Sequence, residues 1–236
     1  MKPSASPAAP EDESLEYISI LSHILMTPLS GIVLWCDMLR GKQELPELVE
    51  RGLVAIDRSA RAQVAILDNL VELGRLQARS TELHRSRVDL LACVRDVLAR
   101  NASAAVQHKV TLRFEPPAKE HVVEGDPVRL RTALHNVVAN AVKASPTGGR
   151  IDVVLEGSAG GFSVLVSDEG SGIAPEALPG LFEIRSLNDA EVARRRGALG
   201  LGLPIARWIL ELHGGSLLLS AREPQGCCCT LLLPRA

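Results

Sequence analysis

Residues 125–144 read GDPVRLRTALHNVVANAVKA and carry the clearest structural signal in the chain. Asp126 stands directly before Pro127, and an acidic N-cap followed by proline at the first helical position is typical of a helix start. Beyond them, apolar residues recur every three or four positions, as on the buried face of an amphipathic helix. The stretch therefore predicts a helix from Asp126 to Ala144.

The polar side of this predicted helix carries a distinctive set of side chains. Asn136, Asn140 and Lys143 follow one another at steps of four and three residues, which places them on one face. Amide oxygens are ligands for hard cations, and an ammonium group binds phosphate. A polar face that is only solvated would show the same pattern, so the three residues need support from other signals.

Alternating helix and strand signals surround this stretch from about residue 87 to the C-terminus. Further helices are expected at 89–107 and about 202–213, and strands at 110–114, 122–124, 150–156, 162–167, 216–221 and 228–233. The small residues 157–161 predict a hairpin between two of the strands. Residues 80–87 are polar and are expected to form a linker. The alternation predicts a two-layer α/β sandwich over residues 87–236.

The segment VSDEGSGI, residues 166–173, follows one of the predicted strands. Asp168 at a strand end can accept a hydrogen bond from an exocyclic amine, while Gly170 and Gly172 let the backbone pass close to a flat ring. On its own, an Asp-x-Gly-x-Gly sequence is most often only a turn. It therefore indicates a nucleotide site only together with other motifs.

A second glycine-rich segment, GALGLGL at residues 197–203, precedes the last predicted helix. Gly200 and Gly202 would expose backbone N–H groups at the helix N-terminus, next to Leu203, where phosphate oxygens bind readily. The preceding Arg194, Arg195 and Arg196 are expected in a loop, and arginines in such loops are usually only solvated.

The N-terminal part of the chain shows a different, sevenfold pattern. Apolar or small residues recur at steps of seven in two segments, Ile18, Leu25, Ile32 and Leu39, and then Leu53, Ala60, Leu67 and Gly74. Two long helices, joined by a short polar connection around Pro46, would form an antiparallel hairpin over residues 14–80. Because one hairpin leaves most of its apolar stripe in water, a second copy should complete a four-helix bundle. The pattern predicts a homodimer.

The first of these helices carries the segment SHILMTPL, residues 22–29. If Ile18 and Leu25 occupy the seam, His23 faces solvent, with Thr27 one turn later on the same side. Pro28 removes a backbone hydrogen bond just beyond the histidine, which a purely structural helix has little reason to do. An exposed histidine by itself is usually an ordinary surface residue, so only the surrounding motif can indicate a functional role.

Bulk properties exclude several classes of function. The net charge of −2 and the 3% of aromatic residues argue against nucleic acid as a partner. The five cysteines lack Cys-x-x-Cys spacing, so we expect thiols in a reduced, cytoplasmic compartment and no zinc site. The sequence contains no run of about 18 apolar residues, so no membrane span is predicted. Residues 1–13, rich in proline and acidic residues, are expected to be a disordered leader.

Taken together, these segments resemble the sensor histidine kinases of two-component systems. The segment 22–29 is similar to the family's H-box, the helix at 126–144 to its N-box, and the two glycine segments to its G1 and G2 boxes. Leu181 and Phe182 are similar to the F-box. The order and spacing of the boxes cover roughly residues 14–236. The resemblance implies a HisKA-type phosphoacceptor hairpin followed by a Bergerat-type ATP-binding sandwich.

The resemblance also implies a role for each matching residue. His23 would take a phosphoryl group from ATP and pass it to an Asp of a response regulator receiver domain, and Thr27 would serve a phosphatase activity. Asn136 and Asn140 would hold Mg²⁺, and Asp168 would bind the adenine amino group. The remaining implied ATP-binding residues are Lys143, Gly170, Gly172, Gly200, Gly202 and Leu203.

Departures from the family pattern leave alternatives open. Ile24 and Met26 stand where most members have an acidic residue and an Arg, and Ala198 and Leu199 alter the G2 box. A carboxylate next to the histidine normally assists proton transfer, so a degenerate interaction or phosphotransfer module is the second hypothesis. A kinase acting on Ser or Thr of a partner is a third. The input could come from a sensor segment elsewhere in a longer chain or from a separate sensor protein.

Overall fold

The computed structural model describes residues 29–36, 46–77, 82–158, 160–173, 179–182 and 201–235. They divide into two compact units. Within the described residues, the first unit holds 29–36 and 46–70, and the second holds everything from residue 71 onward. The second unit therefore includes the last turns of the long helix as well as the sandwich.

The first unit is helical, as the sevenfold pattern predicted. Residues 29–36 form a helix, and α2 runs over Pro46–Gln77. A Cβ added to Gly31 would stand 3.0 Å from Ser59 Oγ, so the two helices approach closely at this glycine. The rest of the predicted first helix, including His23 and Thr27, lies outside the described residues.

Both helices leave apolar side chains in contact with solvent in the single chain. Leu53 is 57% exposed and Leu67 47% exposed, which are two of the predicted seam positions. Further exposed apolar residues of the unit are Leu29, Val33, Leu34, Val49, Val54 and Val64. Exposed apolar side chains of this kind are what a second hairpin would cover. None of the helices in the described parts of the chain has the length and hydropathy to cross a bilayer.

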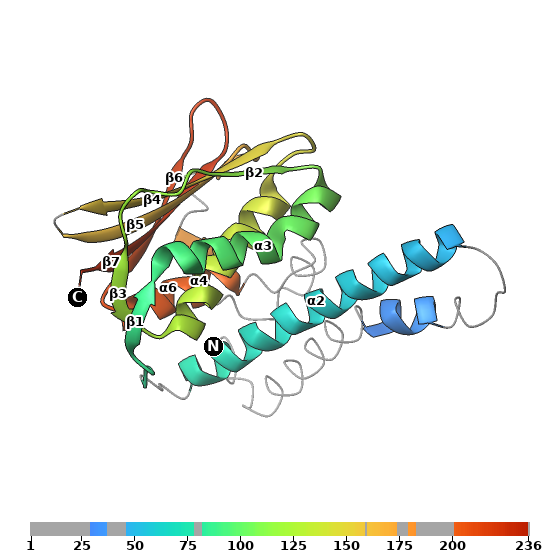
Figure 1. Ribbon diagram of the computed structural model, residues 1–236, viewed down its shortest axis with the longest axis horizontal. Helices are drawn as coiled ribbons and strands as arrows, with labels where there is room; N and C mark the ends of the chain where they lie inside the picture. Colours follow the sequence, from blue (N-terminus) through green and yellow to red (C-terminus); the bar gives the residue numbers. More distant parts are fainter. Residues whose placement is uncertain are drawn as a thin grey trace, which may run out of the picture. The chain divides into compact units, whose positions relative to one another are not determined.

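The second unit is a two-layer α/β sandwich, which confirms the predicted fold class. Its five-stranded sheet has the order β2-β4-β5-β7-β6, with β2 parallel to β4 and all other pairs antiparallel. The strands are β2 (Thr111–Phe114), β4 (Arg150–Ser158), β5 (Gly161–Asp168), β6 (Ser216–Ala221) and β7 (Cys227–Pro234). Helices α3 (Leu90–His108), α4 (Pro127–Ala144) and α6 (Gly202–Leu212) cover one face of it (Figure 1).

A small second sheet departs from the sequence prediction. β1 (Ser86–Asp89) pairs antiparallel with β3 (Val122–Gly125). The sequence assigned Ser86 and Arg87 to a polar linker, and that assignment was wrong. Only Val88 of β1 is buried, so the strand forms through backbone pairing with β3 and carries almost no hydrophobic pattern of its own.

The start of α4 is fixed by Asp126, as predicted. Its Oδ1 accepts hydrogen bonds from the backbone N–H groups of Val128 (3.0 Å) and Arg129 (3.1 Å), and its Oδ2 from that of His84 (3.1 Å). Burial tends to raise the pKa of Asp126, but these hydrogen bonds outweigh it and the pKa is lowered. The cap therefore stays ionised and ties the segment before β1 to α4.

His213, at the C-terminal end of α6, completes this arrangement from the other side. The backbone N–H of Asp126 donates to its Nε2 at 2.9 Å, and its Nδ1 donates to the carbonyl oxygen of Ile209 at 2.7 Å. The neutral imidazole is thus fixed in one tautomer. A Cβ on Gly125 would lie 2.8 Å from the His213 ring, so glycine at this position lets the ring reach Asp126.

The neutral state of His213 makes stability depend on pH. Burial lowers the pKa of His213 below its usual 6.5. Protonation would also remove the acceptor for Asp126 N–H. The unfolded chain therefore binds a proton more readily than the folded one. We expect the contribution to be complete above pH 6.5 and to be lost below it, by at most about 1.4 kcal/mol per pH unit. Urea unfolding of His213→Gln, which keeps an acceptor without titrating, should show a flatter dependence between pH 7.5 and 5.5; an identical slope would contradict the assignment.

Candidate nucleotide-binding site

The N-box candidates lie on α4 in unequal surroundings. Asn136 is buried, whereas Asn140 and Lys143 are exposed toward the C-terminal end of the helix. Partial burial nevertheless lowers the pKa of the Lys143 ammonium. The helix therefore offers one amide held inside the fold, and one amide and one ammonium free to meet a ligand.

Asp168 ends β5 and is only 6% exposed. Its Oδ1 accepts from the backbone N–H of Gly170 at 2.9 Å, and the backbone N–H of Cys227 also bonds to the carboxyl group. Burial raises the pKa of Asp168, although these hydrogen bonds and the charge of Arg222 oppose the rise. A carboxylate fixed in this way has oxygen lone pairs left to accept from an amine.

The loop after Asp168 passes close to α4. A Cβ on Gly170 would stand 2.6 Å from the carbonyl oxygen of Ala144, so any side chain there would push the loop away from the helix end. Gly172 has a φ of +74°, which favours glycine, and lies near Gly226, the residue before β7. The first glycine segment therefore lies beside the end of α4 that bears Asn140 and Lys143.

The second glycine segment meets the same helix. Gly202 begins α6, and a Cβ there would stand 3.4 Å from Asn136 Oδ1. Leu203 is buried beneath the first turn of α6. The structure thus brings Asn136 and Gly202 together. Gly200 lies outside the described residues, as do the loop arginines and Ala198 and Leu199.

A group of charged residues supports the Asp168 loop, and the sequence analysis missed it. Arg222 donates through Nη1 to the carbonyl oxygen of Ser167 at 3.3 Å and through Nη2 to Asp152 at 3.1 Å. Glu169 accepts from the backbone N–H of Arg150 at 3.0 Å and lies 3.7 Å from Arg222. These contacts join segments far apart in the chain, so no sequence spacing could have revealed them.

Cysteine side chains of β7 adjoin the site without reactive character. Cys227 is paired in register with Asp168, and Cys227 and Cys229 are buried while Cys228 is partly exposed, as strand alternation predicted. All are free thiols. Burial raises the pKa of Cys227 to about 12, so it remains protonated. Cys227 is thus a neutral neighbour of the carboxylate.

The F-box candidate Phe182 is linked to α6. The guanidinium carbon of Arg207 lies 5.1 Å from the centre of the Phe182 ring, and Arg207 also donates to Glu211 at 2.8 Å. This cation–π contact links Phe182 to α6, although the two are separated by about twenty residues in the sequence.

The fold and the site geometry fit a nucleotide-binding domain that follows a helical segment in the sequence. Residues 125–236 match the family of histidine kinase-, DNA gyrase B- and HSP90-like ATPases, and residues 14–79 match the His Kinase A phospho-acceptor domain. The chain therefore belongs to the sensor histidine kinases and has both of their characteristic domains.

Individual relatives agree with this assignment. The sensor-like histidine kinase SenX3 of Mycobacterium tuberculosis is 29% identical over 219 residues, which cover 93% of this chain and 53% of that protein. The catalytic domain of the histidine kinase ThkA is 25% identical with a TM-score of 0.57, over 64% of this chain and 96% of that one. The histidine kinase AdeS of Acinetobacter baumannii, 20% identical, shares the fold over 90% of this chain and 97% of its own, with a TM-score of 0.59. The chain spans about half the length of SenX3. It spans a smaller share of other curated relatives.

Proposed function

We propose that the chain is an ATP-dependent protein-histidine kinase that phosphorylates its own His23 and passes the phosphoryl group to an Asp of a response regulator receiver domain. The observation that carries the proposal is the buried Asp168 with its glycine loop, lying against the end of α4 that exposes Asn140 and Lys143. Family membership in both domains supports it.

Each part of the site has a role in this proposal. Asp168 accepts a hydrogen bond from the adenine amino group of ATP. Asn140 and Asn136 supply amide oxygens for Mg²⁺, which neutralises phosphate charge when bound, and Lys143 approaches the phosphates. Glycine in place of any larger residue leaves the ligand access to the backbone. The residues assigned to that task are Gly170, Gly172, Gly200 and Gly202, and Leu203 is the last residue assigned to the ATP-binding site.

The chemistry itself falls on His23. One imidazole nitrogen forms a bond to the γ-phosphorus while the bond to the bridging oxygen breaks and ADP leaves, and the proton on the other nitrogen is released. Because most catalysis of phosphoryl transfer is positioning and charge neutralisation, the sandwich contributes through geometry. Thr27, one turn beyond His23, would serve a phosphatase activity.

The proposal includes a homodimer and a separate receiver domain as partners. The exposed apolar residues of the hairpin, such as Leu53 and Leu67, support dimerisation because a solvated apolar stripe is unfavourable. Covering it with a second hairpin would form the four-helix bundle.

Incubation with γ-labelled ATP tests the proposal directly. We expect an acid-labile, alkali-stable label on the wild-type chain, which His23→Gln abolishes because the acceptor nitrogen is gone. Asn140→Asp should also abolish labelling, because it changes the amide assigned to Mg²⁺. The residue is exposed, so the substitution leaves the core untouched. Circular dichroism of both variants controls for folding. A folded wild-type chain that binds ATP and remains unlabelled would refute autokinase activity.

A further inference from the structure

A cavity lies at the other end of the sheet from Asp168. Its volume is about 570 Å³, and it is bounded by the β2–β3 connection, the end of β4, the start of β5 and the C-terminal Arg235. Phe162 and Asp168 stand near opposite ends of β5, which at about 3.3 Å per residue separates them by roughly 20 Å. The cavity is thus distinct from the nucleotide site and is large enough for a small organic ligand.

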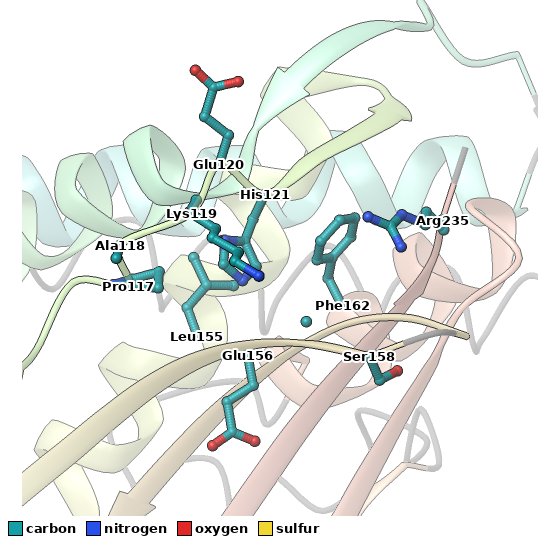
Figure 2. A pocket seen from close by; sticks show the side chains of 11 residues that line it. Pro117, Ala118, Lys119, Glu120, His121, Leu155, Glu156, Ser158, Phe162 and Arg235 are labelled. Carbon is teal, nitrogen blue, oxygen red and sulfur yellow. The ribbon is translucent and has the colours of Figure 1, made fainter.

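The walls of the cavity combine an apolar floor with positive charge. The side chains of Lys119, His121, Phe162 and Arg235 converge on the cavity, whereas the carboxylate of Glu156 points away from it (Figure 2). The Glu120 carboxylate also points away in this view. The Arg235 guanidinium carbon lies 5.7 Å from the centre of the Phe162 ring. The charge presented to a ligand is therefore cationic, although Glu120 and Glu156 also belong to the residues around the cavity.

His121 supplies a fixed polar group in this wall. It is only 5% exposed, and its ring packs against that of Phe162 with the centres 5.1 Å apart. Its Nδ1 lies 2.8 Å from the carbonyl oxygen of Lys119, which can only accept, so Nδ1 carries the proton. The described part of the chain offers Nε2 no hydrogen-bond partner. An almost fully buried imidazole thus turns an unused acceptor toward the cavity.

Gly157 leaves the space beside this acceptor open. A Cβ at Gly157 would stand 3.3 Å from His121 Nε2 and equally close to the Phe162 ring. A larger side chain at this position would fill the part of the cavity where the acceptor and the aromatic ring meet.

We propose that this cavity binds a small aromatic carboxylate that carries a hydroxyl group. Lys119 and Arg235 hold the carboxylate, the rings of Phe162 and His121 contact the flat body, and His121 Nε2 accepts a hydrogen bond from the hydroxyl. The proposal follows from the convergence of two cations, an aromatic floor and one unpartnered acceptor in a single cavity. It does not depend on kinase activity.

A matched series of probes tests each contact by NMR of the ¹⁵N-labelled full chain. We expect 6-hydroxy-2-naphthoate to cause saturable shifts at Lys119, His121 and Gly157 and none at Gly170. Its methyl ester, which lacks the charge, and 2-naphthoate, which lacks the hydroxyl, should each bind about tenfold more weakly. No saturable shift, shifts centred on Gly170, or equal affinity for all three probes would overturn the proposal.

Variants separate the cavity from adventitious binding elsewhere. Lys119→Gln and Arg235→Gln remove exposed charges and should each weaken 6-hydroxy-2-naphthoate binding about tenfold. Gly157→Val should abolish binding while the remaining amide spectrum is retained. Arg100→Gln, an exposed arginine on α3, is the matched control and should leave the affinity unchanged. Unaltered binding to both charge variants, or an equal loss with Arg100→Gln, would contradict the assigned site.

Discussion

Replacing Ile24 with Glu is expected to raise the rate of autophosphorylation by roughly 10²-fold or more. The imidazole of His23 must release a proton as it attacks phosphorus, and a carboxylate on the next residue can accept that proton or orient the ring. General-base assistance of this kind typically contributes about 10²–10⁴-fold in rate. Ile24 offers neither charge nor a hydrogen bond, so the wild-type chain should label slowly. Initial rates of labelling at saturating ATP measure the change.

Ile24→Gln provides the matched control for this expectation. Glutamine has nearly the same shape and polarity as glutamate but is not a base at neutral pH. If Ile24→Glu accelerates labelling and Ile24→Gln does not, proton transfer limits the wild-type rate. Equal rates in the two variants would show that polarity or helix geometry near His23 matters instead. His23→Gln combined with Ile24→Glu should remain unlabelled.

Local signals in the sequence predicted most of the secondary structure. The Asp126-Pro127 pair marked the start of α4 correctly, because a capping interaction involves residues only a few positions apart. The alternation of Cys227, Cys228 and Cys229 between the buried and partly exposed faces of β7 was also legible from strand periodicity. Such features depend on neighbours in the chain and need no knowledge of the fold.

Contacts between distant segments could not be predicted in the same way. The register that sets Cys227 opposite Asp168, and the hydrogen bond from Arg222 to Ser167, depend on how β5 and β7 pair. β1 escaped notice because its pairing with β3 supplies what its own composition lacks. The motifs indicate which residues would bind a nucleotide, but only the sheet topology shows which groups hold Asp168 in place.

A buried ion pair at the end of α2 is another contact between distant residues that no local sequence pattern predicts. Glu72 and Arg129 have side chains that are each 5% exposed, with Arg129 Nε 3.8 Å from Glu72 Oε2. Arg75 lies 2.6 Å from the other oxygen, Oε1, and Trp208 packs 5.5 Å from the Arg129 guanidinium. Among the residues that the structure describes, neither Glu72 Oε2 nor Arg129 Nη1 has a hydrogen-bond partner. Both charges are therefore desolvated with incomplete compensation.

We expect Glu72→Met to lower the free energy of unfolding of the second unit by about 3–5 kcal/mol, because it leaves the Arg129 charge buried beside Trp208 alone. Arg129→Met should cost less, since Glu72 keeps Arg75. The double variant should be close to wild type, because removing both charges also removes the cost of burying them. Urea unfolding followed by Trp208 fluorescence in a Trp35→Phe background measures the cycle.

Arg100→Met, which breaks an exposed pair with Asp96, should change stability by less than about 1 kcal/mol. Additive losses from the two buried substitutions would mean that the charges are not coupled, and that packing of the side chains holds the end of α2 in the second unit.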